Sequence, residues 1–198
     1  MPLTLVLAST SKYRKELLGR LDVDFVQAAP TYDEDADRGR FDELADEAFA
    51  LEMALRKAES LASSYPAHLI LAADQIAVLP GPPRQLLCKP GTEAAAVEQL
   101  LLLSGTSHRL TTGVVLYDTR SSSFQSTVDR QTLTMRAFDR DEATRYIARH
   151  RPLDCVGSYR IEDAGIALFE SIDTKDYTGI IGLPLLAVAR LLRAAGVL

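Results

Sequence analysis

Hydroxyl and cationic side chains gather where an apolar run meets a helical pattern, in LASTSKYRKELL from Leu7 to Leu18. Three consecutive hydroxyl residues begin at Ser9, and Arg14 follows shortly after them. Backbone N–H groups at the start of a helix favour an anion, and arginine offers phosphate a planar, two-pronged contact. The pattern therefore indicates a phosphate-binding turn that includes Ser9 and Arg14. The alternative is that Ser11 only caps the helix and the cations face water.

A carboxylate interrupts a second apolar run, LILAADQIAVL, where we expect a buried strand over 69–73 that ends at Asp74. Residues 76–79 could continue this strand. A buried carboxylate costs free energy unless it is paired, hydrated or bound to a metal. Asp74 could hold a divalent ion or serve as a general base. The alternative, an aspartate that begins a turn, is weakened by the apolar residues on both sides.

Three other charged residues each allow two interpretations. Glu34, in the acidic stretch YDED, supplies a metal ligand or belongs to a solvated loop. Lys89, in CKP, neutralises phosphate charge or is simply solvated. Lys57 falls in an apolar helical pattern, so it reaches inward to a phosphate or lies on the flank with its ammonium in water.

Several familiar catalytic motifs are missing from the sequence. It contains no Walker-type Gly-Lys-Ser/Thr loop and no Gly-x-Ser-x-Gly nucleophile elbow. The three histidines are scattered and resemble no zinc site, and the two cysteines lack metal or redox spacing. These patterns argue against a P-loop enzyme, a serine hydrolase of this type and a zinc protein.

The elements that must position these residues alternate in type along the chain. We expect strands over 3–8, 25–28, 69–73, 109–117 and 124–135. We expect helices over 13–19, 41–65, 92–104, 139–150 and 185–195. We also expect a mostly extended segment over 156–169 with bends at Gly157 and Gly165. Alternating helices and strands followed by a hairpin predict an α/β fold with a mixed sheet.

Length and charge narrow the class of protein further. A chain of 198 residues suits one domain, with room for two lobes and a full core. The net charge of −5 provides no basic field for DNA or RNA, although a local cluster of cations can still bind a small anion. Because we find neither a signal-peptide pattern nor an apolar run long enough for a membrane, we expect a cytoplasmic protein.

Taken together, the motifs resemble those of the Maf family of nucleotide pyrophosphatases over essentially the whole chain. In order, they are ASTSKYRKELL, YDE, LRKAESLA, AADQIAVL, CKP, LSGTSHRLTTGVVL, GSYRIEDAGIALFE and IIGLP. The resemblance implies one domain over 1–198 with a two-lobed, mixed-sheet, inosine-triphosphatase-like fold and a central cleft. It also implies hydrolysis of a nucleoside triphosphate to the monophosphate and pyrophosphate, a divalent cation such as Mg²⁺ or Mn²⁺, and a homodimer.

The family pattern also implies roles for individual residues. Asp74 matches the catalytic acidic position, described as the proton acceptor, and Glu34 and Asp74 would be metal ligands. The residues that would bind the substrate phosphates are Ser9, Arg14, Lys57 and Lys89. Cys88 departs from the pattern, because the family usually has glycine before Lys-Pro.

Three positions separate two branches of this family, one acting on dTTP and UTP and the other resembling a 7-methyl-GTP pyrophosphatase. Tyr13, Gln75 and Glu162 all fit the second branch. The Glu162 carboxylate suits the N1–H and exocyclic amine of guanine, and Tyr13 could stack on a cationic methylated base. The alternatives are a dTTP/UTP pyrophosphatase and a nucleotide-binding regulator of cell division with little turnover.

Overall fold

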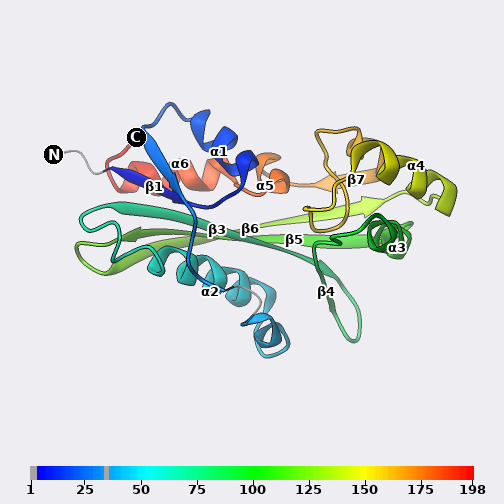
Figure 1. The fold of residues 1–198 in the computed structure, drawn as a ribbon, viewed down its shortest axis with the longest axis horizontal. Coiled ribbons are helices and arrows are strands. Elements are labelled where there is room, and N and C mark those ends of the chain that lie inside the picture. Colours follow the sequence, from blue (N-terminus) through cyan, green and yellow to red (C-terminus); the bar gives the residue numbers. More distant parts are fainter. Residues whose placement is uncertain (1–3, 34–35) are drawn as a thin grey trace. The chain divides into compact units, whose positions relative to one another are not determined.

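The computed structural model describes residues 4–33 and 36–198, and it has a seven-stranded mixed sheet with helices packed on it (Figure 1). The strand order is β2-β1-β3-β5-β6-β7, with β4 paired to β3. The strands are β1 (Leu5–Ala8), β2 (Phe25–Ala28), β3 (Leu69–Leu79), β4 (Gln85–Leu87), β5 (Ser107–Asp118), β6 (Ser123–Met135) and β7 (Phe169–Asp173). The expected α/β fold with a mixed sheet is confirmed, since β1 pairs parallel to β2 and β3 whereas β6 and β7 pair antiparallel.

The expected helices are present in the expected order, together with a further short helix over 178–181, and some of them begin at a side-chain cap. They are α1 (Lys12–Gly19), α2 (Asp46–Glu59), α3 (Glu93–Leu103), α4 (Arg140–His150), α5 (Thr178–Ile181) and α6 (Leu185–Ala194), with 3₁₀ turns η1 (Arg38–Asp42) and η2 (Gly165–Leu168). Ser11, Thr92 and Asp139 each accept a hydrogen bond from a backbone N–H of the helix that follows. These side chains fix where α1, α3 and α4 begin.

The chain divides into two compact units. The first comprises Met1–Gln75, Thr111–Asp129 and Asp176–Leu198, and the second comprises Ile76–Leu110 and Arg130–Lys175. The three long strands β3, β5 and β6 each contribute residues to both units.

In the first unit, helices cover both faces of the sheet (Figure 1). Leu69 and Leu71 of β3 pack in one apolar cluster with residues of α1 and α6, whereas Ile70 and Ala72 pack in another with residues of α2. Successive side chains of a strand point to opposite faces of the sheet. Neighbouring residues of β3 therefore face different helical layers.

Strand β3 continues through 76–79, as the sequence allowed, so Asp74 lies within the strand rather than at its end. The strand continues because the residues after Asp74 are also apolar and buried. Its parallel neighbour β1 pairs with it from Leu5↔Leu69 to Leu7↔Leu71 and ends at Ala8. Asp74 therefore lies beyond the carboxyl end of the neighbouring strand, the edge where α/β proteins commonly bind ligands.

Two other expectations about elements were wrong. The helix expected over 41–65 is shorter, because η1 precedes α2 and turns follow it. The segment expected to be extended over 156–169 instead forms turns and η2. Ser158 and Ala164 have positive φ, which lies outside the regular extended conformation.

In the second unit, α3 packs against α4 and a histidine lies in the core. His108 is fully buried, and its Nε2 lies 2.8 Å from the Tyr159 hydroxyl. Its Nδ1 has no hydrogen-bond partner among the described residues. Burial lowers the pKa of His108 from 6.5 to about 4, so the ring is neutral at pH 7.

His108 should make the folding stability depend on pH. Because its pKa is lower in the folded chain, the penalty is absent above pH 6.5 and grows as the pH falls toward 4. Between pH 7 and pH 4.5 we expect wild type to lose about 2–3 kcal/mol more unfolding free energy than His108→Gln, which cannot titrate. Urea unfolding at both pH values measures the difference, and equal losses in the two proteins would refute this role.

Candidate active site

The centre of the candidate site is an ion pair inside the first unit. Lys57 Nζ lies 2.5 Å from Asp74 Oδ1, and the two side chains are only 5% and 10% exposed. Lys57 shares the buried side of α2 with Ala54 and Ala58, whose small side chains pack against the sheet. The helix therefore directs this lysine inward, and the interpretation that it lies on the flank was wrong.

The pair explains how a carboxylate is tolerated within a buried strand. Either ion alone would carry a large desolvation cost, which their mutual attraction offsets. A carboxylate has two acceptor oxygens and an ammonium has three donors. The Asp74 carboxylate can therefore take part in the pair and still accept a hydrogen bond from a water molecule.

The turn between β1 and α1 is organised by its own hydroxyl groups. Ser11 Oγ accepts the backbone N–H of Arg14 at 3.3 Å, and Ser9 Oγ accepts that of Ser11 at 3.1 Å. Gln27 holds the turn from β2 by donating to the Ser11 carbonyl at 3.1 Å. Ser11 thus caps the helix, as one interpretation of the sequence predicts, and the buried Ser9 hydroxyl still has a proton that it can donate to an anion.

Arg14 and Gln75 both contact the segment around α5. Arg14 Nε donates to the Gly182 carbonyl at 2.9 Å. Gln75 Nε2 donates to the Gly179 carbonyl at 2.6 Å and to Thr112 Oγ1 at 3.0 Å. Asp74 and Gln75 are adjacent in β3, so their side chains point to opposite faces of the sheet, the first toward α2 and the second toward α5.

The second unit carries two of the described candidates, Lys89 and Glu162, and both are exposed. Gln99 of α3 links the segments that carry them: its Nε2 donates to the Cys88 carbonyl at 2.9 Å, and its Oε1 accepts the Ser158 hydroxyl at 2.6 Å. A cysteine in place of the usual glycine is compatible with this anchoring, because Gln99 contacts only its backbone.

The turn that carries Glu162 is held by its neighbours on both sides. Arg160 pairs with Asp163 at 2.8 Å and with Asp154 at 3.3 Å. The Tyr146 hydroxyl accepts the Arg160 backbone N–H at 3.0 Å. The turn is therefore fixed while the Glu162 side chain is exposed to solvent.

The remaining candidate positions are more peripheral. Tyr13 is half-buried, and Lys12 Nζ lies 4.9 Å from its ring centroid. Glu34 lies outside the described residues. Among residues 4–33 and 36–198, no three acidic, histidine or cysteine side chains gather in a group that could hold a metal.

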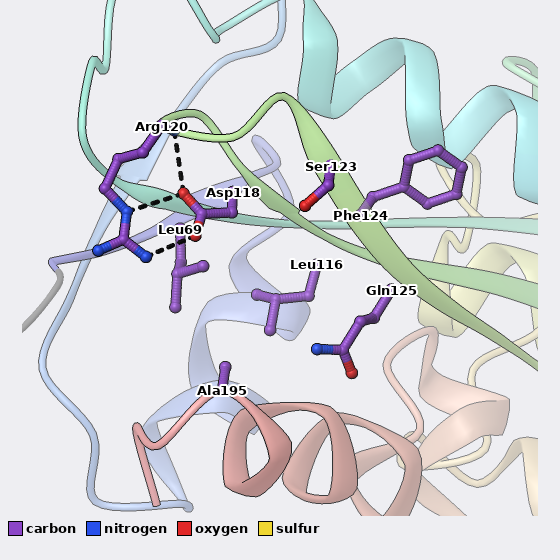
Figure 2. Close-up of a pocket in the computed structure, with 8 residues that line it drawn as sticks. All are labelled: Leu69, Leu116, Asp118, Arg120, Ser123, Phe124, Gln125 and Ala195. Carbon is purple, nitrogen blue, oxygen red and sulfur yellow. Dashed lines mark hydrogen bonds and ion pairs between the residues drawn. The ribbon is translucent and has the colours of Figure 1, made fainter.

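A pocket of about 190 Å³ also lies in the first unit, but it contains none of the candidate residues (Figure 2). It is lined by Leu69, Leu116, Asp118, Arg120, Ser123, Phe124, Gln125 and Ala195. Arg120 is paired with Asp118 at 2.5 Å, so the two charges in the pocket neutralise each other. Since the rest of the lining is apolar or neutral, the pocket offers no catalytic group.

Three residues of the site were not anticipated from the sequence: Thr112, Gly179 and Gly182. Thr112 is buried in a strand, and the two glycines act through their carbonyl groups. Residue type gives no signal for a backbone acceptor. The sequence did hold one indirect sign, because a glycine before Leu-Pro marks a bend, and Gly182 has φ +112°.

Comparisons with known proteins extend over the whole chain. A family model described as "Maf-like protein" matches residues 4–195. The 7-methyl-GTP pyrophosphatase of Hahella chejuensis is 43% identical over 98% of this chain and 94% of its own. The 7-methyl-GTP pyrophosphatase of Pseudomonas putida is 41% identical over 99% of this chain and 98% of its own.

One solved structure also shows a likeness, and it is weak. The dITP/XTP pyrophosphatase of Mycobacterium abscessus is 17% identical, with a TM-score of 0.41 over 67% of this chain and 74% of that one. This likeness is too low to bear on the fold or on the site. Within the part of the chain that the structure describes, no helix is long and apolar enough to cross a membrane.

Proposed function

The chain belongs to the Maf-like protein family, and on that premise we propose that it hydrolyses 7-methyl-GTP to 7-methyl-GMP and pyrophosphate. The observation that carries the proposal is the sequence similarity of the chain to two 7-methyl-GTP pyrophosphatases. The chain is 43% and 41% identical to them over nearly its full length. The buried Lys57–Asp74 pair beyond the end of β1 supports a hydrolytic reaction, because it keeps a carboxylate at a ligand-binding edge.

In this proposal Asp74 is the general base. Its carboxylate accepts a proton from the water that attacks the phosphoanhydride. Lys57 holds the carboxylate in place and compensates its charge. The lysine ammonium has three donors, so it can also contact a phosphate oxygen on the same side of the sheet.

The other phosphate contacts come from groups that carry N–H or O–H donors. Ser9 and Arg14 lie at the β1–α1 turn, where the first backbone N–H groups of α1 favour negative charge. Lys89 is the third cation that we propose as a phosphate contact. Donors fixed before the reaction stabilise the charge that develops on the leaving pyrophosphate.

A divalent cation fits the donor set that we assign. Mg²⁺ is commonly held by one or two carboxylates together with waters and substrate phosphates, so Asp74 is an adequate protein ligand and Glu34 is proposed as the second. When bound, such an ion would neutralise phosphate charge and lower the pKa of a bound water.

We assign selection of the base to two of the three branch-specific residues, Tyr13 and Glu162. Tyr13 would stack on the methylated ring, Glu162 would accept hydrogen bonds from guanine, and Gln75 would act near the Arg14 end of the site. The proposal also treats residues 1–198 as one catalytic domain of a cytoplasmic homodimer that binds no nucleic acid. Light scattering of the purified protein tests the dimer.

We expect Glu162→Gln to impair base selection more than it impairs the chemistry. A carboxylate accepts both guanine donors and offsets the positive charge of the methylated ring, whereas an amide turns a donor toward a donor. A mispaired polar group costs about 1–3 kcal/mol, so kcat/KM for 7-methyl-GTP should fall about 5- to 150-fold. Steady-state kinetics with 7-methyl-GTP, GTP and UTP measures this.

Two outcomes would argue against this role of Glu162. A variant equal to wild type on every nucleotide would mean that the exposed side chain remains in solvent. An equal loss on all three nucleotides would place Glu162 at the triphosphate or the metal. Glu170→Gln is a matched control, because Glu170 is an exposed glutamate of the same unit.

The bond that is cleaved provides the test of the reaction type. Cleavage between the α- and β-phosphates gives equal amounts of 7-methyl-GMP and pyrophosphate, whereas cleavage of the terminal bond gives 7-methyl-GDP and orthophosphate. Chromatography of the products after partial turnover distinguishes the two. The second product pair would contradict the proposal, and tight binding without any product would favour a nucleotide-binding regulator.

A further inference from the structure

Two residues proposed to contact substrate are joined through the backbone of a third segment, α5 and its C-terminal turn. Gly182 accepts a hydrogen bond from Arg14 Nε at 2.9 Å, and Gly179 accepts one from Gln75 Nε2 at 2.6 Å. Gly182 also closes α5 by donating its N–H to the Gly179 carbonyl at 3.0 Å. One short turn therefore touches both side chains.

Both N–H donors of Gln75 are engaged inside the protein. One hydrogen bond goes to Gly179 and the other, 3.0 Å long, goes to Thr112 of β5. A primary amide has only two N–H donors. Gln75 could therefore contact a nucleobase only as a hydrogen-bond acceptor. In the described structure its hydrogen bonds connect β3 to β5 and to α5.

The segment that Gln75 contacts is itself firmly anchored. Buried Asp176 accepts the Thr178 backbone N–H at 3.0 Å, the Thr178 hydroxyl at 2.5 Å and the Leu186 N–H at 2.7 Å. The Thr178 hydroxyl in turn accepts the Leu185 N–H at 2.8 Å. These bonds join α5 to the start of α6, so the position of the Gly182 carbonyl is set by a rigid frame.

Close packing at Gly182 brings Arg14 and Gln75 to the same point. A Cβ on Gly182 would lie 3.6 Å from Arg14 Nε and 3.8 Å from Gln75 Oε1. The bond to Gly182 fixes the Nε edge of the guanidinium, so an anion would be bound by the terminal nitrogens of Arg14. The orientation of those nitrogens depends on where the turn holds the carbonyl.

We propose that Gln75 is a positioning residue: through the turn at Gly179–Gly182 it fixes the orientation of Arg14. It thereby raises the affinity for the polyphosphate of every nucleotide. This inference rests on the proposed function for the identity of the substrate. It assigns to Gln75 a role in phosphate binding rather than direct contact with the base. The Gly179 and Gly182 carbonyls and Asp176 contribute to the same positioning of Arg14.

The test uses inorganic tripolyphosphate, which has the phosphates of the substrate and no base. Titration calorimetry with the full chain should show binding that Arg14→Met weakens about 10- to 100-fold. Gln75→Met keeps the size of the side chain and removes both donors, and it should weaken binding about 3- to 10-fold. Gln125→Met, at an exposed glutamine of the same unit, is the matched control and should bind as wild type does.

A double variant separates positioning from a general structural defect. If Gln75 acts through Arg14, Gln75→Met should weaken binding no further once Arg14 is already methionine. In turnover, Gln75→Met should lower kcat/KM by the same factor for 7-methyl-GTP, GTP and UTP. Additive losses in the double variant, or a loss confined to 7-methyl-GTP, would overturn the inference.

The remaining outcomes are also decisive. Wild-type protein that does not bind tripolyphosphate, or Gln75→Met that binds it as wild type does, would overturn the inference even if 7-methyl-GTP is hydrolysed. The expected pattern of tripolyphosphate binding in a protein that hydrolyses no nucleotide would instead support the inference and contradict the proposed function.

Discussion

Asp74→Asn is expected to lower kcat by about 10²- to 10⁴-fold, the usual consequence of removing a general base. The amide has nearly the same size as the carboxylate, but it cannot accept a proton and is a poor ligand for a cation. Steady-state kinetics with 7-methyl-GTP measures the loss. If the folded variant kept more than about a tenth of the wild-type rate, Asp74 would not be the base.

This substitution also leaves Lys57 as a buried ammonium without its counter-charge, so the variant needs a control for folding. The double variant Asp74→Asn/Lys57→Met removes both charges and keeps the shape of both side chains. We expect it to be as inactive as Asp74→Asn and more stable. Recovery of activity in the double variant would mean that the unpaired lysine, rather than the missing carboxylate, had blocked turnover.

Lys57→Met is expected to lower the free energy of unfolding by about 3–5 kcal/mol, because it leaves the Asp74 carboxylate buried without a partner. The methionine preserves packing of α2 against the sheet, so the loss measures charge rather than volume. Urea unfolding determines it, and Lys15→Met, at an exposed lysine of α1, is the control and should change stability by less than about 0.5 kcal/mol.

The double variant completes a thermodynamic cycle for this pair. Its unfolding free energy should be higher than the value calculated by subtracting both single losses from that of wild type. Each single variant leaves one buried ion without its counter-charge, whereas the double variant leaves none. Additive losses would show that Lys57 and Asp74 do not interact in solution.

The sequence predicts the elements near the site well because their signals are local. Apolar runs mark the strands, and hydroxyl or carboxylate caps mark the starts of α1, α3 and α4. A bend at Gly157 is predicted by its residue type and is present, but the further turns of this segment could not be predicted in the same way. Ser158 and Ala164 adopt positive φ, a conformation that neither residue type signals.

The contacts of the site depend on tertiary structure. The sequence identifies Asp74 and Lys57 as charged residues in apolar patterns, but their pairing follows from how α2 packs on β3. Likewise, Arg14 and Gly182 are 168 positions apart, and Gly182 contributes only its carbonyl. No periodicity or motif encodes such a contact, so residue types indicated the candidates and the fold determined their partners.

Pyrophosphate release from a panel of 7-methyl-GTP, GTP, dTTP and UTP tests the central claim most directly. Purified full-length protein with Mg²⁺ or Mn²⁺ would be assayed at equal nucleotide concentrations, with Asp74→Asn as the blank for contaminating enzymes. We predict kcat/KM for 7-methyl-GTP well above the values for dTTP and UTP. Preferred hydrolysis of dTTP or UTP, or binding of 7-methyl-GTP without pyrophosphate release, would contradict the account.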